Sequence, residues 1–306
     1  MRILLAGSTG LLGSALRSAL IERGDEVVRL TRPETTGASG ILWDPASPEP
    51  LDPDVLTGFD AVVNFAGRSI GEKRWSDREK AALWASRVDF SAGLARAIAA
   101  SPKPKVWINA SAVGFYGDRG DDIVTEDDPQ GGGFLAELTA SWEAATAPAA
   151  EAGVRVVLMR NGIVLSADGG ALGRLLAPFG PRWLSPYRWG LGGPVGKGTQ
   201  YWSWVSLDDH TRATLHALDG EIAGPINVVA PNPVMHRTFI RALGRVLRRP
   251  TVMPVPRLVL DAVLGRELAA ALVHEGQRVM PERLAADGFE FHDTDVESAL
   301  RQALAG

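Results

Sequence analysis

Cysteine is absent from the 306-residue chain. Its absence excludes disulfide bonds, catalysis by a thiolate and metal sites with cysteine ligands. Long apolar runs are absent too, because no stretch approaches the roughly 18–20 apolar residues that a membrane-spanning helix needs. The chain opens on the apolar segment RILLAG, without the basic and apolar regions of an export signal. We therefore expect a cytoplasmic protein that does not enter a membrane.

The chain also has no excess of positive charge. Its formal net charge is −4 and its isoelectric point is about 5.8. A nucleic acid partner is not expected, because its phosphates attract basic surfaces. Apolar residues make up 45% of the chain and charged residues 22%, which is ordinary for a globular protein with a sizeable core. The expected partner is a small-molecule substrate, and a homodimer is possible by analogy.

Strand and helix signals alternate through the first half of the chain, which is typical of a parallel sheet with crossover helices. Apolar strands are predicted at residues 2–7, 26–32, 41–43, 61–67, 105–111, 154–160, 201–207 and 225–231. Helices are predicted at residues 11–24, 76–100, 171–177 and 208–219, and helical signals continue from 235 to the end. The strands are apolar throughout, as expected when helices cover both faces of a sheet. The predicted fold class is α/β, a doubly wound, Rossmann-like parallel sheet with a smaller, mainly helical C-terminal domain.

A glycine-rich turn, LLAGSTGLLGSAL, follows the first predicted strand and enters the first predicted helix. In this position Gly7 allows the tight turn, Gly10 lets the backbone approach a pyrophosphate, and Gly13 lets the helix pack close to the strand. The spacing is G-x-x-G-x-x-G, and no Lys-Ser/Thr pair follows, so the turn is not a Walker A loop. The context of strand, turn and helix predicts a dinucleotide site.

The second strand ends at Thr31 and Arg32. An acidic residue at this point would bind the ribose 2′-hydroxyl of NAD, whereas an arginine suits the 2′-phosphate of NADP. Glu34 lies two residues further on and weakens this preference. We predict NADP(H) as the cofactor. In an open parallel sheet the ligand lies at the carboxyl ends of the strands, where the small-residue segment NFAG (64–67) ends the fourth strand.

Many further motifs occur in a fixed order along the chain. They are WDP (43–45), NFAG (64–67), RW (74–75), SRV (86–88), SAVGFYGD (111–118), GGFLAEL…WE (132–143), GGPVGKGTQ (192–200), SWVSLDD (203–209), NVVAPNPV (227–234) and GQRVMPERLAADGFEF (276–291). Together they resemble the extended short-chain dehydrogenase/reductase superfamily, and within it the atypical epimerase-family subgroup, the SDR39U-like group.

The resemblance implies a Rossmann-like domain that binds NADP(H) and a characteristic C-terminal domain that closes over a cleft. We predict the NADP-binding domain at residues 1–230, with 165–200 contributing to the substrate cleft, and the C-terminal domain at 231–306. Arg87 matches a position expected to line the cofactor. The residues predicted to contact the cofactor are Gly7, Ser8, Thr9, Gly10, Leu11, Leu12, Gly13, Thr31, Arg32, Phe65, Ala66, Gly67, Arg87, Ser111 and Asn161.

In this superfamily a Tyr four residues before a Lys, with a nearby Ser or Thr, handles the proton during hydride transfer. The chain has no Tyr-x-x-x-Lys: its three tyrosines are followed four residues later by Gly120, Leu191 and Val205. In the segment GGGFLAELTASWE the matching positions are assigned to Phe134 and Leu138. The helix is therefore expected to persist without its proton-handling pair.

Few residues remain as candidates for the missing chemistry. Ala112 matches the position of the catalytic hydroxyl, and Ser111 lies one residue earlier, where an extended strand turns it the other way. Ser111 and Tyr116 stay as weak catalytic candidates. Asp208, Asp209 and His210 fit the start of a helix better than a metal site, so no metal is expected.

Two functions fit these features. The first is an NADP(H)-dependent oxidoreductase or epimerase-like enzyme with an unusual proton donor, acting on an unknown small molecule. The second is a noncatalytic NADPH-binding sensor or interaction protein. The retained cofactor turn supports both, and the missing Tyr-Lys pair leaves the choice open.

Overall fold

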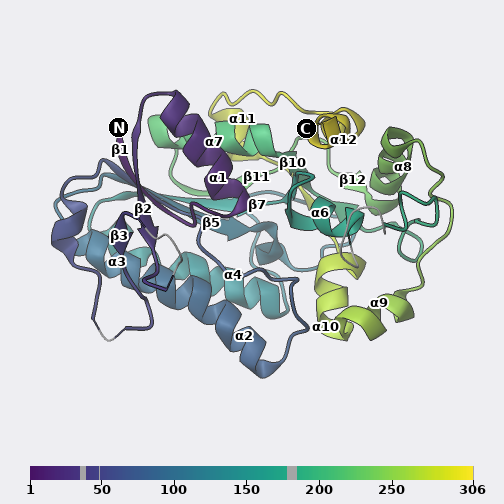
Figure 1. Ribbon diagram of the computed structural model, residues 1–306, viewed down its shortest axis with the longest axis horizontal. Helices are drawn as coiled ribbons and strands as arrows, with labels where there is room; N and C mark the ends of the chain where they lie inside the picture. Colours follow the sequence, from purple (N-terminus) through teal and green to yellow (C-terminus); the bar gives the residue numbers. More distant parts are fainter. Residues whose placement is uncertain (35–38, 48, 178–184, 306) are drawn as a thin grey trace.

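The computed structural model of the chain describes residues 1–34, 39–47, 49–177 and 185–305 (Figure 1). At its centre is a parallel sheet of seven strands in the order β11-β7-β5-β4-β1-β2-β3. These strands are β1 (Arg2–Ala6), β2 (Glu26–Thr31), β3 (Ile41–Leu42), β4 (Ala61–Asn64), β5 (Val106–Ala112), β7 (Arg155–Asn161) and β11 (Gly224–Val228). The predicted α/β class with a Rossmann-like sheet is confirmed.

The strand order reverses at the first strand, because β1 pairs with β2 on one side and with β4 on the other. The reversal leaves a crevice at the carboxyl ends of these strands, where ligands of open α/β sheets bind. β4 is fully buried, as its apolar sequence predicts. The glycine-rich turn follows β1 directly and therefore lies at this crevice.

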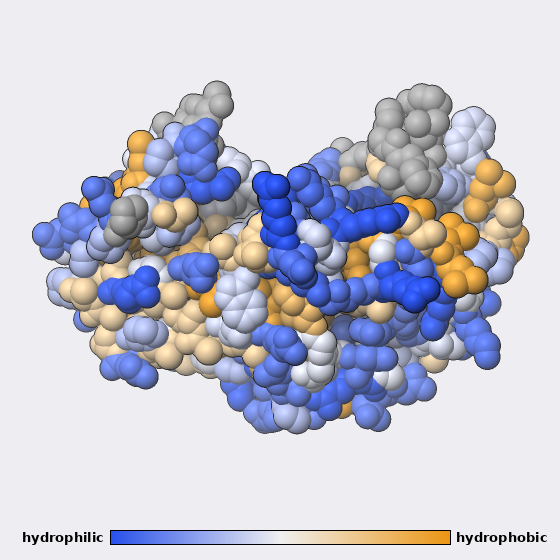
Figure 2. All heavy atoms as spheres, turned by 90° about the horizontal axis from the view of Figure 1, so that it is seen from below, coloured by the Kyte–Doolittle hydropathy of each residue, from blue (hydrophilic) through white to orange (hydrophobic). Residues whose placement is uncertain are grey.

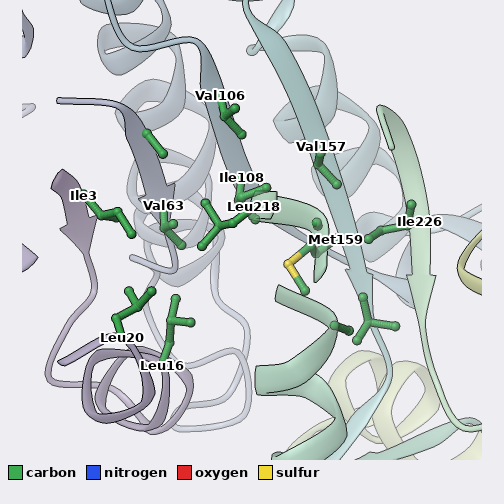
Figure 3. Close-up of a cluster of buried hydrophobic side chains, with 14 of the residues drawn as sticks. Ile3, Leu16, Leu20, Val63, Val106, Ile108, Val157, Met159, Leu218 and Ile226 are labelled. Atoms are coloured by element: carbon green, nitrogen blue, oxygen red, sulfur yellow. The ribbon is translucent and has the colours of Figure 1, made fainter. Parts of the chain in front are cut away.

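Helices cover both faces of the sheet (Figure 1). On one face α1 and α7 pack through residues such as Leu16, Leu20 and Leu218 against Ile3, Val63 and the other strand residues in Figure 3. On the other face α3 and α5 pack against the opposite side chains of the same strands, among them Leu4, Val62 and Trp107. The helices of these two layers are α1 (Leu11–Glu22), α2 (Asp77–Trp84), α3 (Phe90–Ala100), α4 (Phe134–Ala144), α5 (Ala147–Glu151) and α7 (Leu207–Asp219).

The helix predicted at residues 76–100 forms, but it contains one irregular turn. Ser76 caps its start by accepting a hydrogen bond from the Glu79 amide. Between α2 and α3, the segment Ala85–Asp89 forms a turn of π-helix. Such turns often lie at functional sites, and this one carries Arg87.

Short paired strands surround the carboxyl edge of the main sheet. The predicted strand at 201–207 divides into two pieces that pair with different partners. The pairs are β8 (Ile163–Leu165) with β10 (Trp204–Ser206), β9 (Tyr201–Trp202) with β12 (Val234–Met235), and β6 (Ile123–Val124) with β13 (Arg278–Val279). The last pair joins the C-terminal region to the loop after β5, so the two parts of the chain interleave.

The C-terminal region is mainly helical, as predicted. Its helices are α8 (His236–Leu247), α9 (Arg257–Leu264), α10 (Arg266–Ala269), α11 (Glu282–Ala286) and α12 (Val296–Ala305), and α6 (Gly170–Leu176) lies beside them. A third core joins α6, α8 and α12 to β8–β10. Leu284 and Phe289 instead belong to the core of the main sheet. Of the segment predicted to border the substrate cleft, residues 178–184 lie outside the described residues.

Exposed apolar side chains gather on α9, where Leu258, Val259 and Val263 are exposed. Figure 2 shows apolar atoms gathered at the right of one face, while hydrophilic residues cover much of the rest of that face. Among the helices of the described ranges, none is both long and apolar enough to cross a lipid bilayer.

Candidate cofactor and substrate cleft

Two glycines of the turn after β1 are required by the fold itself. Gly7 has a φ of +77°, and a Cβ there would lie 2.4 Å from the Phe65 carbonyl carbon. A Cβ on Gly13 would lie 2.1 Å from the Gly7 carbonyl oxygen. Both distances are impossible for a real side chain, so these glycines let β1, α1 and the end of β4 approach one another.

The third glycine is different. Gly10 has a φ of −76°, and a Cβ there would meet only the Gly7 carbonyl oxygen, at 3.4 Å. The fold therefore has room for a side chain at Gly10. No side chain caps α1 at Gly10, and its first turn carries no acidic residue. The free N–H groups of such a helix start attract phosphate groups.

The end of β2 carries the residues that were predicted to select NADP. Arg32 is exposed and forms an ion pair with Glu34, with Nε and Oε1 3.2 Å apart. The Thr31 hydroxyl is buried and finds no hydrogen-bond partner within the described ranges. An exposed ion pair of this kind contributes little free energy. Breaking the ion pair with Glu34 therefore costs little free energy, and Arg32 can bind a phosphate instead.

Arg87 reaches from the π-helical turn to the end of β4. Its guanidinium lies under Gly67, where a Cβ would approach it to 3.4 Å. Nη2 donates to the Arg68 carbonyl oxygen at 2.8 Å, Nη1 donates to the Ser86 hydroxyl at 3.2 Å, and the group lies 5.3 Å from the ring centre of Trp142. No carboxylate is paired with it in the described parts of the chain. Burial lowers the pKa of Arg87 to about 10, which leaves it a cation at neutral pH.

A cleft opens beside Arg87, between the carboxyl edge of the sheet and the C-terminal region. It encloses about 800 Å³ of space free of protein atoms, including solvent at its mouth. Its walls come from the turn after β5, helix α4, the chain from Asn161 to Ile163, strand β9 with Ser203, and the segment from Ala271 to Gln277. Of the predicted cofactor residues, Arg87 and Asn161 lie in this wall, and the glycine-rich turn and Arg32 lie along the neighbouring strand ends.

Helix α4 presents an apolar face to the cleft, made of Leu135, Leu138, Thr139 and Trp142. The spacing is that of one helical face. The Thr139 hydroxyl donates to the Leu135 carbonyl oxygen at 2.6 Å, so it is already engaged. Neither of the i, i+4 pairs on this face contains a Tyr or a Lys.

The structure places the two positions assigned to the missing pair, Phe134 and Leu138, differently. Leu138 lies in the cleft wall, and Phe134 does not. The Phe134 ring packs against Trp75, with the centroids 5.0 Å apart. Leu135 and Thr139 lie against Gly114 in the turn after β5.

The two weak catalytic candidates belong to one buried polar network. The Ser111 hydroxyl donates to Glu143 at 2.5 Å, and Arg160 donates twice to Glu143, at 2.8 and 2.9 Å. Arg160 also donates to the Tyr116 hydroxyl at 2.9 Å, which in turn donates to Asn227 at 2.7 Å. Burial raises the pKa of Tyr116, and the nearby Arg160 only partly opposes this. Neither Ser111 nor Tyr116 lines the cleft.

Asn161 and His210 form a second buried contact at the end of β7. Asn161 Oδ1 lies 2.9 Å from Nε2 of His210, whose ring packs edge-on against Phe65 at 5.5 Å. Complete burial lowers the pKa of His210 to about 4. The imidazole is therefore neutral at neutral pH and holds Asn161 and Phe65 in place.

The cleft wall contains polar groups that the sequence analysis did not identify. Glu275 and Gln277 come from the C-terminal region, and Tyr201 comes from β9. Burial raises the pKa of Glu275, and the negative charge of Asp118 raises it further. One signal was available, since the matched motif GQRV begins at residue 276, next to Glu275.

The acidic residues at the start of α7 have structural partners. Asp209 Oδ1 accepts from Arg212 and the His292 amide, and Oδ2 accepts from the Asp293 amide. Asp208 lies 3.0 Å from His292. These contacts fasten the segment before α12 to α7.

The fold and the cleft agree with the sequence comparisons. Residues 3–229 match the NAD dependent epimerase/dehydratase family, and the chain belongs to this family. Residues 255–303 match a domain of unknown function, DUF1731. The resemblance to the SDR39U-like group with its C-terminal domain is confirmed.

Particular relatives cover the whole chain. It is 41% identical over 302 residues to the epimerase family protein MT2273 of Mycobacterium tuberculosis (strain CDC 1551 / Oshkosh), covering 98% of this chain and 97% of the relative. It is 35% identical over 310 residues to human epimerase family protein SDR39U1, covering 100% of both. The crystal structure of human SDR39U1 (isoform 2) with NADPH superimposes with a TM-score of 0.89 at 34% identity, covering 100% of this chain and 99% of the other.

Proposed function

We propose that this protein binds NADP(H) and uses it as an oxidoreductase or epimerase-like enzyme on a small molecule. The observation that carries the proposal is the turn at Gly10. It is open to a ligand, it begins an uncapped helix, and it lies where the strand order reverses. The structure of human SDR39U1 was determined with NADPH, which supports the same cofactor here.

The residues around the crevice fit this cofactor. The N–H groups at the start of α1 suit the pyrophosphate, and the exposed Arg32 suits the 2′-phosphate. Thr31 adds a buried hydroxyl without a partner. When bound, the cofactor supplies the hydride. The protein positions it and excludes water, with Arg87 and Asn161 in the wall of the adjoining cleft.

A proton must then come from a group other than a Tyr-Lys pair. Ser111 and Tyr116 are engaged with Glu143 and Arg160, so they are poor donors for the cleft. Glu275 faces the cleft, and burial raises the pKa of its carboxyl group, which makes it the protein's candidate proton donor. Solvent at the mouth of the cleft is the other source.

The second candidate function is noncatalytic NADPH binding by a sensor. One observation favours it: the hydroxyls near the usual catalytic position are built into a buried network instead of the cleft. Under this alternative the cofactor is a bound signal and its nicotinamide is never oxidised.

Cofactor binding is tested by two glycine substitutions in the same turn. Gly10→Ala is expected to keep the melting temperature, because a Cβ has room there, and to weaken NADPH binding by about a hundredfold, since the methyl group occupies the pyrophosphate position. Gly13→Ala is expected to lower stability by about 1–3 kcal/mol, because its Cβ would overlap the Gly7 carbonyl. Titration of NADPH fluorescence and thermal unfolding measure the two effects. Unchanged NADPH affinity in Gly10→Ala would contradict pyrophosphate binding at this turn.

Turnover separates the two candidate functions. NADPH oxidation is followed at 340 nm with a panel of ketones, aldehydes and nucleotide sugars, in the unmodified chain and in Gly10→Ala. Oxidation that depends on a substrate and disappears in the variant supports the enzyme. NADPH binding without oxidation of any panel member supports the sensor.

A further inference from the structure

We propose that the cleft binds a small, mainly apolar ketone or aldehyde, or the corresponding alcohol, and not a nucleoside diphosphate sugar. This inference rests on the proposed function, because it names the substrate class of the same site. It separates this chain from structural neighbours such as UDP-galactose 4-epimerase, which shares the fold at 20% identity.

The first argument is the apolar character of the walls. Leu138 and Trp142 of α4, Ile163 of β8 and Trp202 of β9 face the cleft, and Leu272 borders it from the C-terminal region. They come from separate parts of the chain, so the apolar lining surrounds the ligand. Apolar walls stabilise apolar ligands by removing their surface from water.

The second argument is that two hydroxyls in the wall, those of Ser203 and Thr139, are already satisfied. The Ser203 hydroxyl donates to the Gln277 carbonyl oxygen at 2.7 Å and accepts from the Val279 amide at 2.9 Å. Thr139 donates to the carbonyl oxygen of Leu135. A sugar ring with several hydroxyl groups needs several free partners, since each buried polar group without one costs free energy. A single carbonyl oxygen needs only one or two.

The third argument is charge. Within the described residues the cleft wall holds one cation, Arg87, and one carboxylate, Glu275. Two of the Arg87 nitrogens already donate to the protein. Arg174, which lies close to Gly71 beside the cleft, also donates to the protein, at the Gly71 carbonyl and the Ser69 hydroxyl. A diphosphate carries about two negative charges and is normally held by several cationic or N–H donors. Among the described residues of this cleft, a diphosphate would find too few such donors, and it would face the carboxylate of Glu275.

Hydrogen-bond donors for one oxygen are nevertheless present. Arg87 Nε is buried and has no hydrogen-bond partner within the described ranges. The side-chain amide of Gln277 and the hydroxyl of Tyr201 belong to residues of the same wall. A compound with one carbonyl group and an apolar body therefore matches both the polar and the apolar parts of the cleft.

The test is isothermal titration of the full chain, with and without saturating NADPH, using 4-phenylbutan-2-one and UDP-glucose as probes. The ketone has only eleven non-hydrogen atoms, so the expected Kd is weak, on the order of 1 mM. UDP-glucose is expected to show no binding at several times that concentration. Binding of UDP-glucose, or no binding of the ketone, overturns the inference.

Two matched leucine variants show where the ketone binds. Leu272 is 37% exposed at the border of the cleft, so Leu272→Asp is expected to fold and to weaken ketone binding about fivefold or more. Leu258 on α9 is 79% exposed and is not in the cleft wall, so Leu258→Asp is expected to leave the Kd unchanged. Ketone binding that is equal in both variants overturns the inference. The NADPH titrations in the same series test the proposed function separately, because failure there leaves the ketone result interpretable.

Discussion

The carboxyl ends of the sheet strands differ between the two sides of the crevice. After β1 come Gly10, which has room for a ligand, and the uncapped start of α1; after β2 comes the exposed Arg32. Near the ends of β5 and β7 lie Ser111 and Arg160, which donate hydrogen bonds to Glu143 and, from Arg160, to Tyr116. We call these the open end and the closed end. The open end has N–H donors without a protein partner, whereas the polar side chains of the closed end are hydrogen-bonded to one another.

The difference shows which polar groups beside the crevice are available to a ligand. Buried polar groups are stable only when they are paired, and paired groups are poorly available to a ligand. The open end therefore has polar groups available to a cofactor, whereas those of the closed end hold the structure together. The C-terminal region adds Glu275 and Gln277 to the cleft wall.

The largest expected effect comes from breaking the closed end. Two hydrogen bonds join Arg160, which is buried, to Glu143, whose side chain is 10% exposed. Glu143→Gln keeps the shape of the side chain but leaves the Arg160 charge without its counterion, which is expected to cost about 3–5 kcal/mol in the free energy of unfolding. Urea unfolding measures it.

Glu137 provides the control for that variant. It lies on the same helix but is exposed, so Glu137→Gln is expected to change the free energy of unfolding by less than about 0.5 kcal/mol. Equal effects of the two variants would show that the Glu143–Arg160 pair does not hold the closed end together.

The next largest effect is a pH dependence of the free energy of unfolding that arises from His210, which contacts Asn161 at the end of β7. The pKa of His210 is lowered from 6.5 to about 4 by burial. The unfolded chain therefore takes up the proton first, so this contribution to stability is complete above pH 6.5 and is lost as the pH falls towards 4. At about 1.4 kcal/mol per pH unit, the loss is about 3 kcal/mol. In His210→Gln the free energy of unfolding is expected to fall less over this range.

A second buried histidine sharpens the measurement. Burial lowers the pKa of His236 to about 4 as well, so His210→Gln is expected to reduce the pH dependence and not to abolish it. If the free energy of unfolding of His210→Gln followed that of the unmodified chain from pH 6.5 to 4, the result would contradict the buried, neutral state of His210.

The open end was easier to predict from the sequence than the closed end, for a physical reason. The strand, turn and helix around Gly10 are contiguous, so local spacing defines them. The Glu143–Arg160–Tyr116 network joins three distant segments, and only the folded sheet brings them together. The sequence did not show that Leu138 faces the cleft while Phe134 does not, because glycines before the helix do not fix its rotation. Glu275 was missed because its place in the wall depends on how the C-terminal region folds back.

The smallest expected effect concerns the open end and leaves stability unchanged. Arg32 is exposed, and its ion pair with Glu34 contributes little to folding, so Arg32→Ala should keep the unfolding midpoint. We expect it to weaken NADPH binding about 10- to 100-fold, because the 2′-phosphate loses its charged partner. NADH binding should change less than about twofold, since NADH carries no such phosphate. Fluorescence titration of both cofactors measures the ratio, and Glu34→Gln is the matched variant, expected to tighten NADPH binding slightly by freeing Arg32. Equal weakening of NADPH and NADH in Arg32→Ala would show that this arginine does not read the phosphate, and the selectivity would then have to come from elsewhere at the open end.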